Sequence, residues 1–145
     1  VVVKVKDIID KTVSEFDIKK DRICLTGSSM GGFGTFAVAM TYNNFFSAIA
    51  PVAGGSMAWR AGVLKTTPVY AFHGENDTVV IPEYSKFMVD AINKTGGNAK
   101  LVLLPGLGHN DGIDYTYENT DIIDWLLSQR RTDFTRTPEI CEELF

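Results

Sequence analysis

The residues best placed to do chemistry begin with a serine between glycines, in the segment Gly27-Ser28-Ser29-Met30-Gly31. This segment matches G-x-S-x-G, the pattern of a nucleophile elbow, in which the central serine lies on a tight turn between a strand and a helix. The turn strains the serine backbone, and the flanking glycines let strand and helix approach closely. We expect Ser29 Oγ to project from the carboxyl end of a strand, with the Met30 N–H facing a developing oxyanion.

Two other kinds of glycine-rich loop bind phosphate groups, and this segment departs from both. A dinucleotide-binding loop needs a further glycine where this chain has Phe33, and an acidic residue about 20 residues further on. The chain has no Asp or Glu between Arg22 and Gly74. A P-loop needs Gly-Lys-Ser/Thr, but Phe33 follows Gly32. The pattern therefore favours a nucleophilic serine, and the alternative is a strand–helix turn without chemistry.

A nucleophilic serine needs a base, and the base needs an orienting carboxylate, in the chain order Ser, Asp or Glu, His. The sequence has two histidines, His73 and His109. No acidic residue separates Ser29 from His73, so this order excludes His73 as the base. We interpret it as a strand-end histidine with local hydrogen bonds. His109 follows a strand in a glycine-rich loop, where ligands bind in parallel sheets, and is the candidate base.

The candidate acid follows the strand that ends near His73. Asp77 is the favoured residue and Glu75 is the alternative. Asp111 comes after His109 and does not fit the order. A carboxylate at this place could instead stabilise a turn or a helix N-terminus, and that interpretation also stays open for Asp77.

The elements that must position these residues alternate along the chain. Apolar periodicity predicts helices at about 5–16, 33–44, 82–95 and 117–129, and short apolar runs predict strands at 22–26, 46–53, 68–72 and 100–104. Residues 56–67 have no clear assignment, and the tail from Arg130 shows weak periodicity, so it should be surface-bound or frayed. Apolar strands separated by helices predict an α/β fold, a doubly wound and mostly parallel sheet with helices on both faces.

Composition excludes several classes of protein. The chain has 145 residues, of which 45% are hydrophobic and 22% charged, and a formal net charge of -4, which fits one compact domain. The sequence contains no run of basic residues interleaved with aromatic ones, so it does not indicate a nucleic-acid partner. No apolar run reaches the roughly 20 residues of a membrane span. Two cysteines, Cys24 and Cys141, are too few for a disulfide scaffold or a structural zinc site. We expect no metal and no cofactor.

Three segments resemble the α/β-hydrolase superfamily, and most closely bacterial carboxylesterases of the phospholipase/carboxylesterase, feruloyl-esterase-like and dienelactone-hydrolase-like types. They are Asp21–Gly32 around the serine, Pro68–Val80 around the acid and Leu104–His109 around the histidine. The likeness extends from Val1 to about Arg130. It implies the α/β-hydrolase fold.

The resemblance also implies a serine esterase acting on a small-molecule ester without a cofactor. Ser29 would be the nucleophile, Asp77 the acid and His109 the base. The superfamily has strands ahead of the nucleophile strand, and its second oxyanion donor comes from a loop after an early strand. This chain shows no such strands, so we interpret residues 1–145 as the carboxyl-terminal portion of a single catalytic domain.

Two alternative functions stay open. A serine peptidase of the prolyl-oligopeptidase type would use the same three residues. A non-catalytic fragment could instead use an unpaired edge strand to bind a missing N-terminal segment or a second copy of itself. Trp59, after the second strand, is a candidate for the substrate pocket, with surface packing as the alternative. The sequence leaves the compartment undecided between cytoplasmic and secreted.

Overall fold

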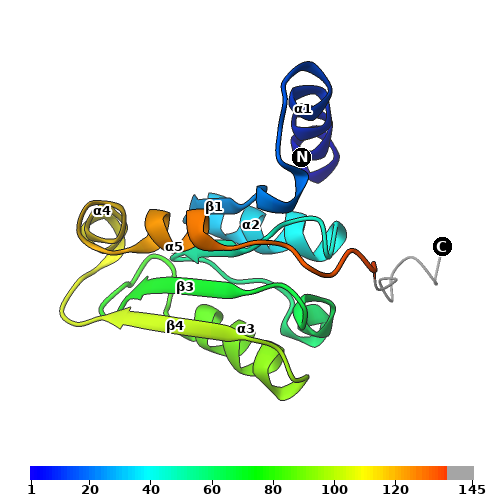
Figure 1. Ribbon diagram of the computed structural model, residues 1–145. Helices are drawn as coiled ribbons and strands as arrows, with labels where there is room; N and C mark the ends of the chain where they lie inside the picture. The colour runs from blue at the N-terminus through cyan, green and yellow to red at the C-terminus, as the bar shows by residue number, and fades with distance from the viewer. Residues whose placement is uncertain (137–145) are drawn as a thin grey trace.

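The computed structural model describes residues 1–136, which are built around a parallel sheet of four strands in the order β1-β2-β3-β4. The elements in chain order are α1 (Val2–Glu15), η1 (Lys20–Arg22), β1 (Leu25–Ser28), α2 (Met30–Thr41), β2 (Ile49–Val52), η2 (Ala58–Leu64), β3 (Val69–Gly74), α3 (Glu83–Lys94), β4 (Ala99–Leu104), α4 (His109–Asn119) and α5 (Ile122–Ser128), where η denotes a 3₁₀ helix. Figure 1 shows the strands side by side at the centre of the molecule.

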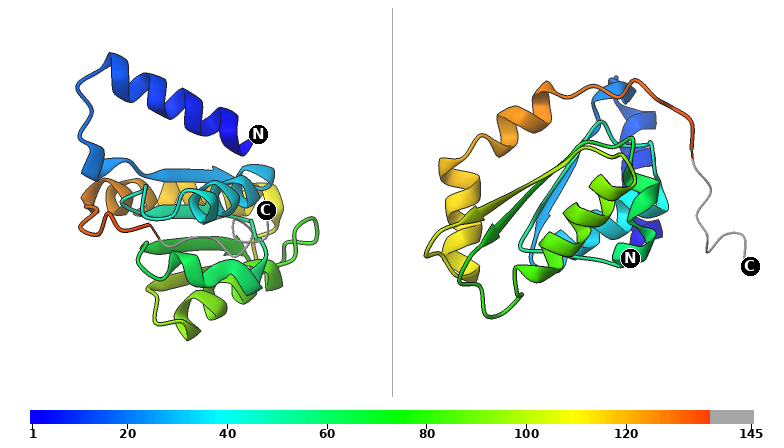
Figure 2. Two further views of the ribbon diagram at one scale, coloured as in Figure 1. Left: turned by 90° about the vertical axis from the view of Figure 1, so that its right-hand side faces the viewer. Right: turned by 90° about the horizontal axis from the view of Figure 1, so that it is seen from below.

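Helices cover both faces of the sheet, which confirms the predicted α/β class. On one face, Phe36 and Met40 of α2 and Met88 of α3 belong to a buried apolar cluster. On the other face, Ile122 and Leu126 of α5 belong to a second cluster. The view from below in Figure 2 shows these helices on opposite sides of the strands. The central strands β2 and β3 are buried along their whole length, and strands covered on both faces are mostly apolar, which is why they were visible as short apolar runs.

The parallel direction of the strands decides where the functional residues lie. Residues Val69 to Gly74 of β3 pair in register with Ala99 to Leu104 of β4, and β1 and β2 pair in the same direction. Parallel strands present their carboxyl ends at one edge of the sheet, which is where ligands bind in such folds. The residues that follow β1, β3 and β4 therefore meet at this edge.

The segment after β4 differs most from the sequence-based prediction. It forms two helices, α4 and α5, where a single helix over 117–129 was predicted. Thr120 adopts an extended backbone and separates the two. The glycines and polar residues at the start of α4 hid its periodicity, but the Asp111 carboxylate accepts a hydrogen bond from the Gly108 N–H at 2.7 Å and stabilises its first turn. His109 is consequently the first residue of a helix rather than part of a free loop.

Smaller differences concern the bounds of other elements. The first strand runs from Leu25 to Ser28, later than predicted, and the following helix already begins at Met30. The unassigned stretch 56–67 contains the 3₁₀ helix η2. On its outer side β1 has no strand neighbour among the described residues. No helix in residues 1–136 combines the length and apolar character needed to cross a membrane.

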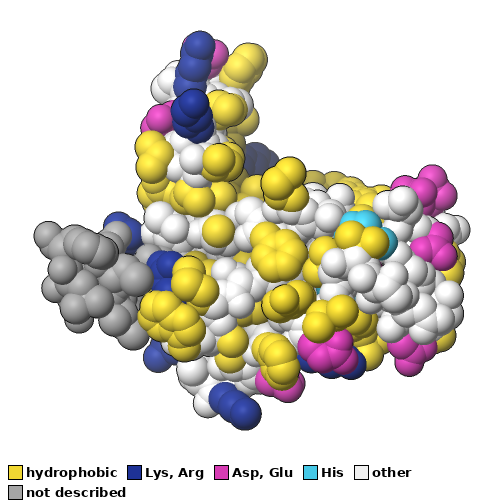
Figure 3. All heavy atoms as spheres, turned by 180° about the vertical axis from the view of Figure 1, so that it is seen from behind, with side chains coloured by type: hydrophobic (Ala, Val, Ile, Leu, Met, Phe, Trp, Pro, Cys, Tyr) yellow, Lys and Arg dark blue, Asp and Glu magenta, His cyan; other side chains and the backbone are white. Residues whose placement is uncertain are grey.

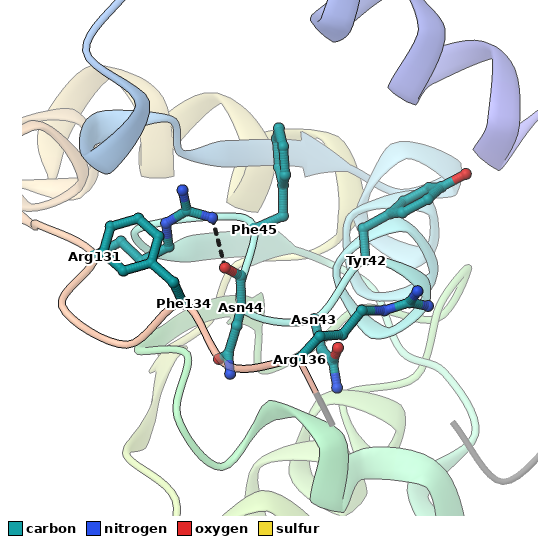
Figure 4. Close-up of a pocket in the computed structure, with 7 residues that line it drawn as sticks. All are labelled: Tyr42, Asn43, Asn44, Phe45, Arg131, Phe134 and Arg136. Carbon is teal, nitrogen blue, oxygen red and sulfur yellow. Dashed lines mark hydrogen bonds between the residues drawn. The ribbon is translucent and has the colours of Figure 1, made fainter. Parts of the chain in front are cut away.

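Arg131 attaches the last described segment to the connection between α2 and β2. Its backbone N–H donates to the Asp21 carbonyl at 2.8 Å, and its Nη1 donates to the Asn44 carbonyl at 2.6 Å. Its guanidinium lies 4.1 Å from the centre of the Phe134 ring. Figure 4 shows these side chains around a pocket that contains none of the candidate catalytic residues. Residues 130–136 are therefore packed on the surface, while the rest of the tail, including Cys141, lies outside the described residues.

Close backbone contact between β2 and α2 provides a test of this architecture. A Cβ atom added at Gly54, just after β2, would lie 2.5 Å from the carbonyl carbon of Gly32 in α2, whereas one added at Gly34 would meet nothing within 4 Å. We expect Gly54→Ala to lower the free energy of unfolding by about 2 kcal/mol or more. Gly34→Ala should raise it by about 0.5 to 1 kcal/mol, because alanine favours a helix over glycine. Urea unfolding measures both, and equal effects would contradict the contact.

Candidate active site

Ser29 lies on the turn between β1 and α2 with a strained backbone. Its φ is 55° and its ψ is -118°, angles that a residue with a side chain rarely adopts, as the elbow motif predicts. A Cβ atom at Gly27 would lie 2.5 Å from the Gly31 carbonyl oxygen, so the strand and helix touch at Gly27. A Cβ atom at Gly31 would meet nothing within 4 Å, so of the two flanking glycines only Gly27 is required by packing.

Asp77 follows β3 and is held by the backbone of its own loop. Its Oδ1 accepts hydrogen bonds from the N–H groups of Val79 and Val80, each at 2.9 Å, and the residue is 3% exposed. Burial by itself raises the pKa of this carboxyl. The hydrogen bonds from His109, Val80 and Val79 outweigh burial and hold the pKa below its usual value. Asp77 is therefore a carboxylate at neutral pH.

His109, at the start of α4, bridges the other two residues. Its Nδ1 is 2.7 Å from Asp77 Oδ2, and its Nε2 is 2.9 Å from Ser29 Oγ. The carboxylate can only accept a hydrogen bond, so Nδ1 carries a proton. In the neutral ring Nε2 is then unprotonated and accepts a hydrogen bond from the Ser29 hydroxyl. A Cβ atom at Gly74 would overlap the Gly108 carbonyl oxygen, so glycine lets the end of β3 approach the histidine segment.

These contacts join a hydroxyl, an imidazole and a carboxylate in one hydrogen-bonded chain. The imidazole is placed to remove the hydroxyl proton, and the carboxylate is placed to stabilise the imidazolium that would result. Met30 is the first residue of α2. Its N–H belongs to the first turn, where backbone N–H groups have no partner within the helix and attract negative charge. The arrangement is therefore suited to nucleophilic attack with local stabilisation of an anion.

The structure places the other candidate residues, Glu75 and Trp59, away from the hydrogen-bonded group of Ser29, His109 and Asp77. Glu75, the alternative acid, is exposed, whereas Asp77 contacts the imidazole. Trp59 lies on η2 with 64% of its surface exposed, and its ring centre is 5.9 Å from the Arg60 guanidinium. No contact found in residues 1–136 joins Trp59 to Ser29 or His109. Its role in a substrate pocket stays a prediction.

His73 is a buried residue whose approach to the candidate acid was not predicted from the sequence. It is 0% exposed, with Nδ1 2.7 Å from Ser85 Oγ and Nε2 2.7 Å from the Val80 carbonyl. Its Nε2 is also 3.3 Å from Asp77 Oδ2. The expected local hydrogen bonds are present, but they lead directly to the candidate acid. The sequence pattern His-Gly-x-x-Asp places His73 and Asp77 near each other along the chain. Their contact could be inferred from it only once β3 was known to end at Gly74.

Two apolar side chains beside the site are exposed. Met30 and Val79, which adjoin Ser29 and the Asp77 loop, are 86% and 72% exposed. Figure 3 shows hydrophobic side chains gathered on the face where a histidine reaches the surface. No group of three His, Cys, Asp or Glu side chains within residues 1–136 is arranged to hold a metal ion.

Comparison with known proteins identifies relatives of this chain. The family model described as phospholipase/carboxylesterase matches residues 2–116. Acyl-protein thioesterase 1 of Neurospora crassa is 28% identical over 132 residues, covering 86% of this chain and 52% of the relative. A bifunctional acetylxylan esterase/xylanase of Neocallimastix patriciarum is 33% identical over 76 residues, covering 52% of this chain and 11% of that enzyme.

A solved structure supports the same relationship. The crystal structure of a thermostable esterase superposes with a TM-score of 0.84 and 33% identity, covering 90% of this chain and 37% of the esterase. The chain thus spans about half the length of the thioesterase that it matches and smaller shares of the two esterases.

The buried His73 predicts how stability depends on pH. Burial lowers its pKa, and the Val80 carbonyl and the Asp77 carboxylate offset only part of this effect. The unfolded chain therefore binds more protons than the folded chain below the ordinary histidine pKa of about 6.5. We expect stability to fall as the pH drops from 7 to 5, by at most about 1.4 kcal/mol per pH unit from this residue.

Thermal unfolding between pH 7 and 5 tests whether His73 causes this pH dependence of stability. The Asp77 carboxyl, with its lowered pKa, titrates at lower pH and does not produce a change in this window. His73→Gln removes the titrating ring and should flatten the dependence of Tm on pH between 7 and 5. An unchanged slope in that variant would show that another group is responsible.

Proposed function

Because this chain belongs to the phospholipase/carboxylesterase family of α/β-hydrolases, we propose that it is a serine hydrolase that cleaves carboxylic ester bonds. Ser29 is the nucleophile, His109 the general base and Asp77 the orienting acid. One observation carries the proposal: the hydrogen-bonded chain from Ser29 Oγ through His109 to Asp77, with distances of 2.9 Å and 2.7 Å. The family relationship says which chemistry such a chain of residues serves.

The reaction proceeds in two halves. Ser29 Oγ attacks the ester carbonyl carbon while His109 Nε2 takes its proton, and a tetrahedral oxyanion forms. The intermediate collapses, the carbon–oxygen bond to the alcohol breaks, and His109 returns its proton to the departing alcohol. Water then attacks the acyl-enzyme with the same base and releases the acid. Asp77 keeps the imidazole in the required tautomer and stabilises its charged form throughout.

Negative charge on the oxyanion requires donors that are already in place. The Met30 N–H at the start of α2 supplies one, and the positive end of the helix adds to it. Loss of a single oxyanion donor in enzymes of this chemistry costs about 100- to 1,000-fold in rate. No second oxyanion donor is among the contacts described for residues 1–136. The rate of the whole protein is therefore proposed and does not follow from these contacts.

Ester cleavage is favoured over the other functions left open by the sequence. The named relatives include esterases and a thioesterase, and a serine acyl-enzyme can form from an oxygen ester or a thioester. Peptide cleavage needs the same residues, so it is the second candidate. An interaction role would leave no reason for the strained Ser29 backbone and the ordered contacts of Asp77.

A serine-directed fluorophosphonate probe and p-nitrophenyl acetate hydrolysis test the nucleophile. Ser29→Ala should abolish labelling and reduce hydrolysis to the level of buffer, because no other hydroxyl contacts His109 among the described residues. Ser28→Ala is the matched control, since the neighbouring serine ends β1 in the same turn. It should retain labelling. Labelling that persists in Ser29→Ala but disappears in Ser28→Ala would contradict the assignment.

The identity of the acid is tested by exchanging carboxylates for amides. Asp77→Asn should lower kcat about 1,000- to 10,000-fold, because an amide cannot hold His109 in the tautomer that accepts the serine proton. Glu75→Gln changes an exposed neighbour and should alter kcat less than about twofold. A larger loss in Glu75→Gln than in Asp77→Asn would show that the acid has been assigned to the wrong residue.

A further inference from the structure

A second imidazole lies beside the same oxygen of the proposed acid. Asp77 Oδ2 is 2.7 Å from His109 Nδ1 and 3.3 Å from His73 Nε2, so two rings face the same carboxylate oxygen. His73 is 0% exposed, and Nε2 is also 2.7 Å from the Val80 carbonyl oxygen. The proposed proton transfer makes no use of His73, although it contacts both the acid and the loop that holds the acid.

The partners of His73 decide which of its nitrogens carries the proton. The Val80 carbonyl can only accept a hydrogen bond, so Nε2 must be protonated. Burial lowers the pKa of the ring, which is therefore neutral at pH 7. Nδ1 lies 2.7 Å from Ser85 Oγ, whose single hydroxyl proton points either at this nitrogen or at the Gly54 carbonyl 2.8 Å away. The Val80 carbonyl thus fixes the single proton of the neutral ring on Nε2.

We propose that His73 is a positioning residue: its Nε2 is bonded to the Val80 carbonyl and lies against Asp77 Oδ2, and so orients the carboxylate that faces His109. The inference rests on the proposed esterase function. The two backbone N–H groups that bind Asp77 both contact Oδ1. Those two bonds alone would let the carboxylate pivot about Oδ1, and His109 and His73 both lie against the second oxygen and restrain it.

The other side of the ring connects the acid loop to the nucleophile turn. Ser85 Oγ lies 2.8 Å from the Gly54 carbonyl oxygen as well as 2.7 Å from His73 Nδ1. Gly54 in turn contacts the backbone of Gly32, three residues after Ser29. A series of buried contacts, ending in close backbone packing of Gly54 on Gly32, therefore runs from the acid to the first turn of α2. Displacement of a reacting group by about 1 Å can cost 100-fold in rate, so this series of contacts bears on catalysis.

Two amide substitutions separate positioning of the acid from filling of the core. The amide of Gln reaches the position of Nε2 and can still donate toward Asp77 and Val80, whereas the shorter Asn reaches only the position of Nδ1. In the intact protein, with p-nitrophenyl acetate, His73→Asn should lower kcat about tenfold or more with little change in KM. His73→Gln should restore most of that loss. Equal losses in the two variants would overturn the proposal.

A double-mutant cycle tests whether His73 acts through Asp77. The second-order rate of fluorophosphonate labelling is measured for His73→Asn alone, for Asp77→Asn alone and for both together. Once Asp77 is replaced, the further effect of His73→Asn should shrink to about twofold or less, because the group being oriented is gone. An undiminished effect would show that His73 supports the fold generally and would overturn the positioning role.

A measurement on the unaltered protein covers the case in which neither His73 variant folds. Imidazole nitrogen NMR at pH 7 should show His73 as the neutral tautomer protonated at Nε2, and a proton at Nδ1 alone would overturn the proposal. Failure of the esterase assignment has a different signature. In that case Ser29→Ala would hydrolyse the ester as fast as the unaltered protein, whatever the His73 variants do.

Discussion

The structure depends on direct backbone contact at the carboxyl edge of the sheet. Gly27 lets β1 touch the first turn of α2, Gly54 lets the end of β2 touch the same helix, and Gly74 lets β3 touch the histidine segment. A side chain at any of these places would separate the two segments. The hydrogen bonds between the residues that follow would then be longer than the normal range allows. Contacts of 2.7 and 2.9 Å between the three candidate catalytic residues are possible because these glycines are there.

Burial and hydrogen bonding together explain the state of the buried ionisable groups. Asp77 is almost wholly buried, which opposes its charge, but two backbone N–H groups and an imidazole stabilise the carboxylate. His73 is buried with partners that favour its charged form less than burial opposes it, so it stays neutral. Asp77 is therefore charged, as an orienting acid must be, while the neighbouring His73 is neutral.

Much of the fold and of the candidate site was predictable from the sequence, for identifiable reasons. Buried parallel strands are short apolar runs, and the elbow motif has strict residue requirements at Ser29, so both are visible in one dimension. The split of the C-terminal helical region was not predictable. The α4 helix begins with His109 and polar residues. The capping role of Asp111 could not be recognised in the sequence, because the glycines around it favour a loop.

The sequence by itself determined the family, the α/β class and the order of the candidate serine, acid and histidine, because these depend on residue types at fixed spacing. The tertiary structure decided which carboxylate meets the imidazole, choosing Asp77 over Glu75, and it placed His73 3.3 Å from the oxygen that faces His109. Spacing along a chain cannot specify such contacts. The ends of β1, β3 and β4 come together only when the strands pair, and the pairing brings residues 32 and 80 positions apart into hydrogen-bond distance.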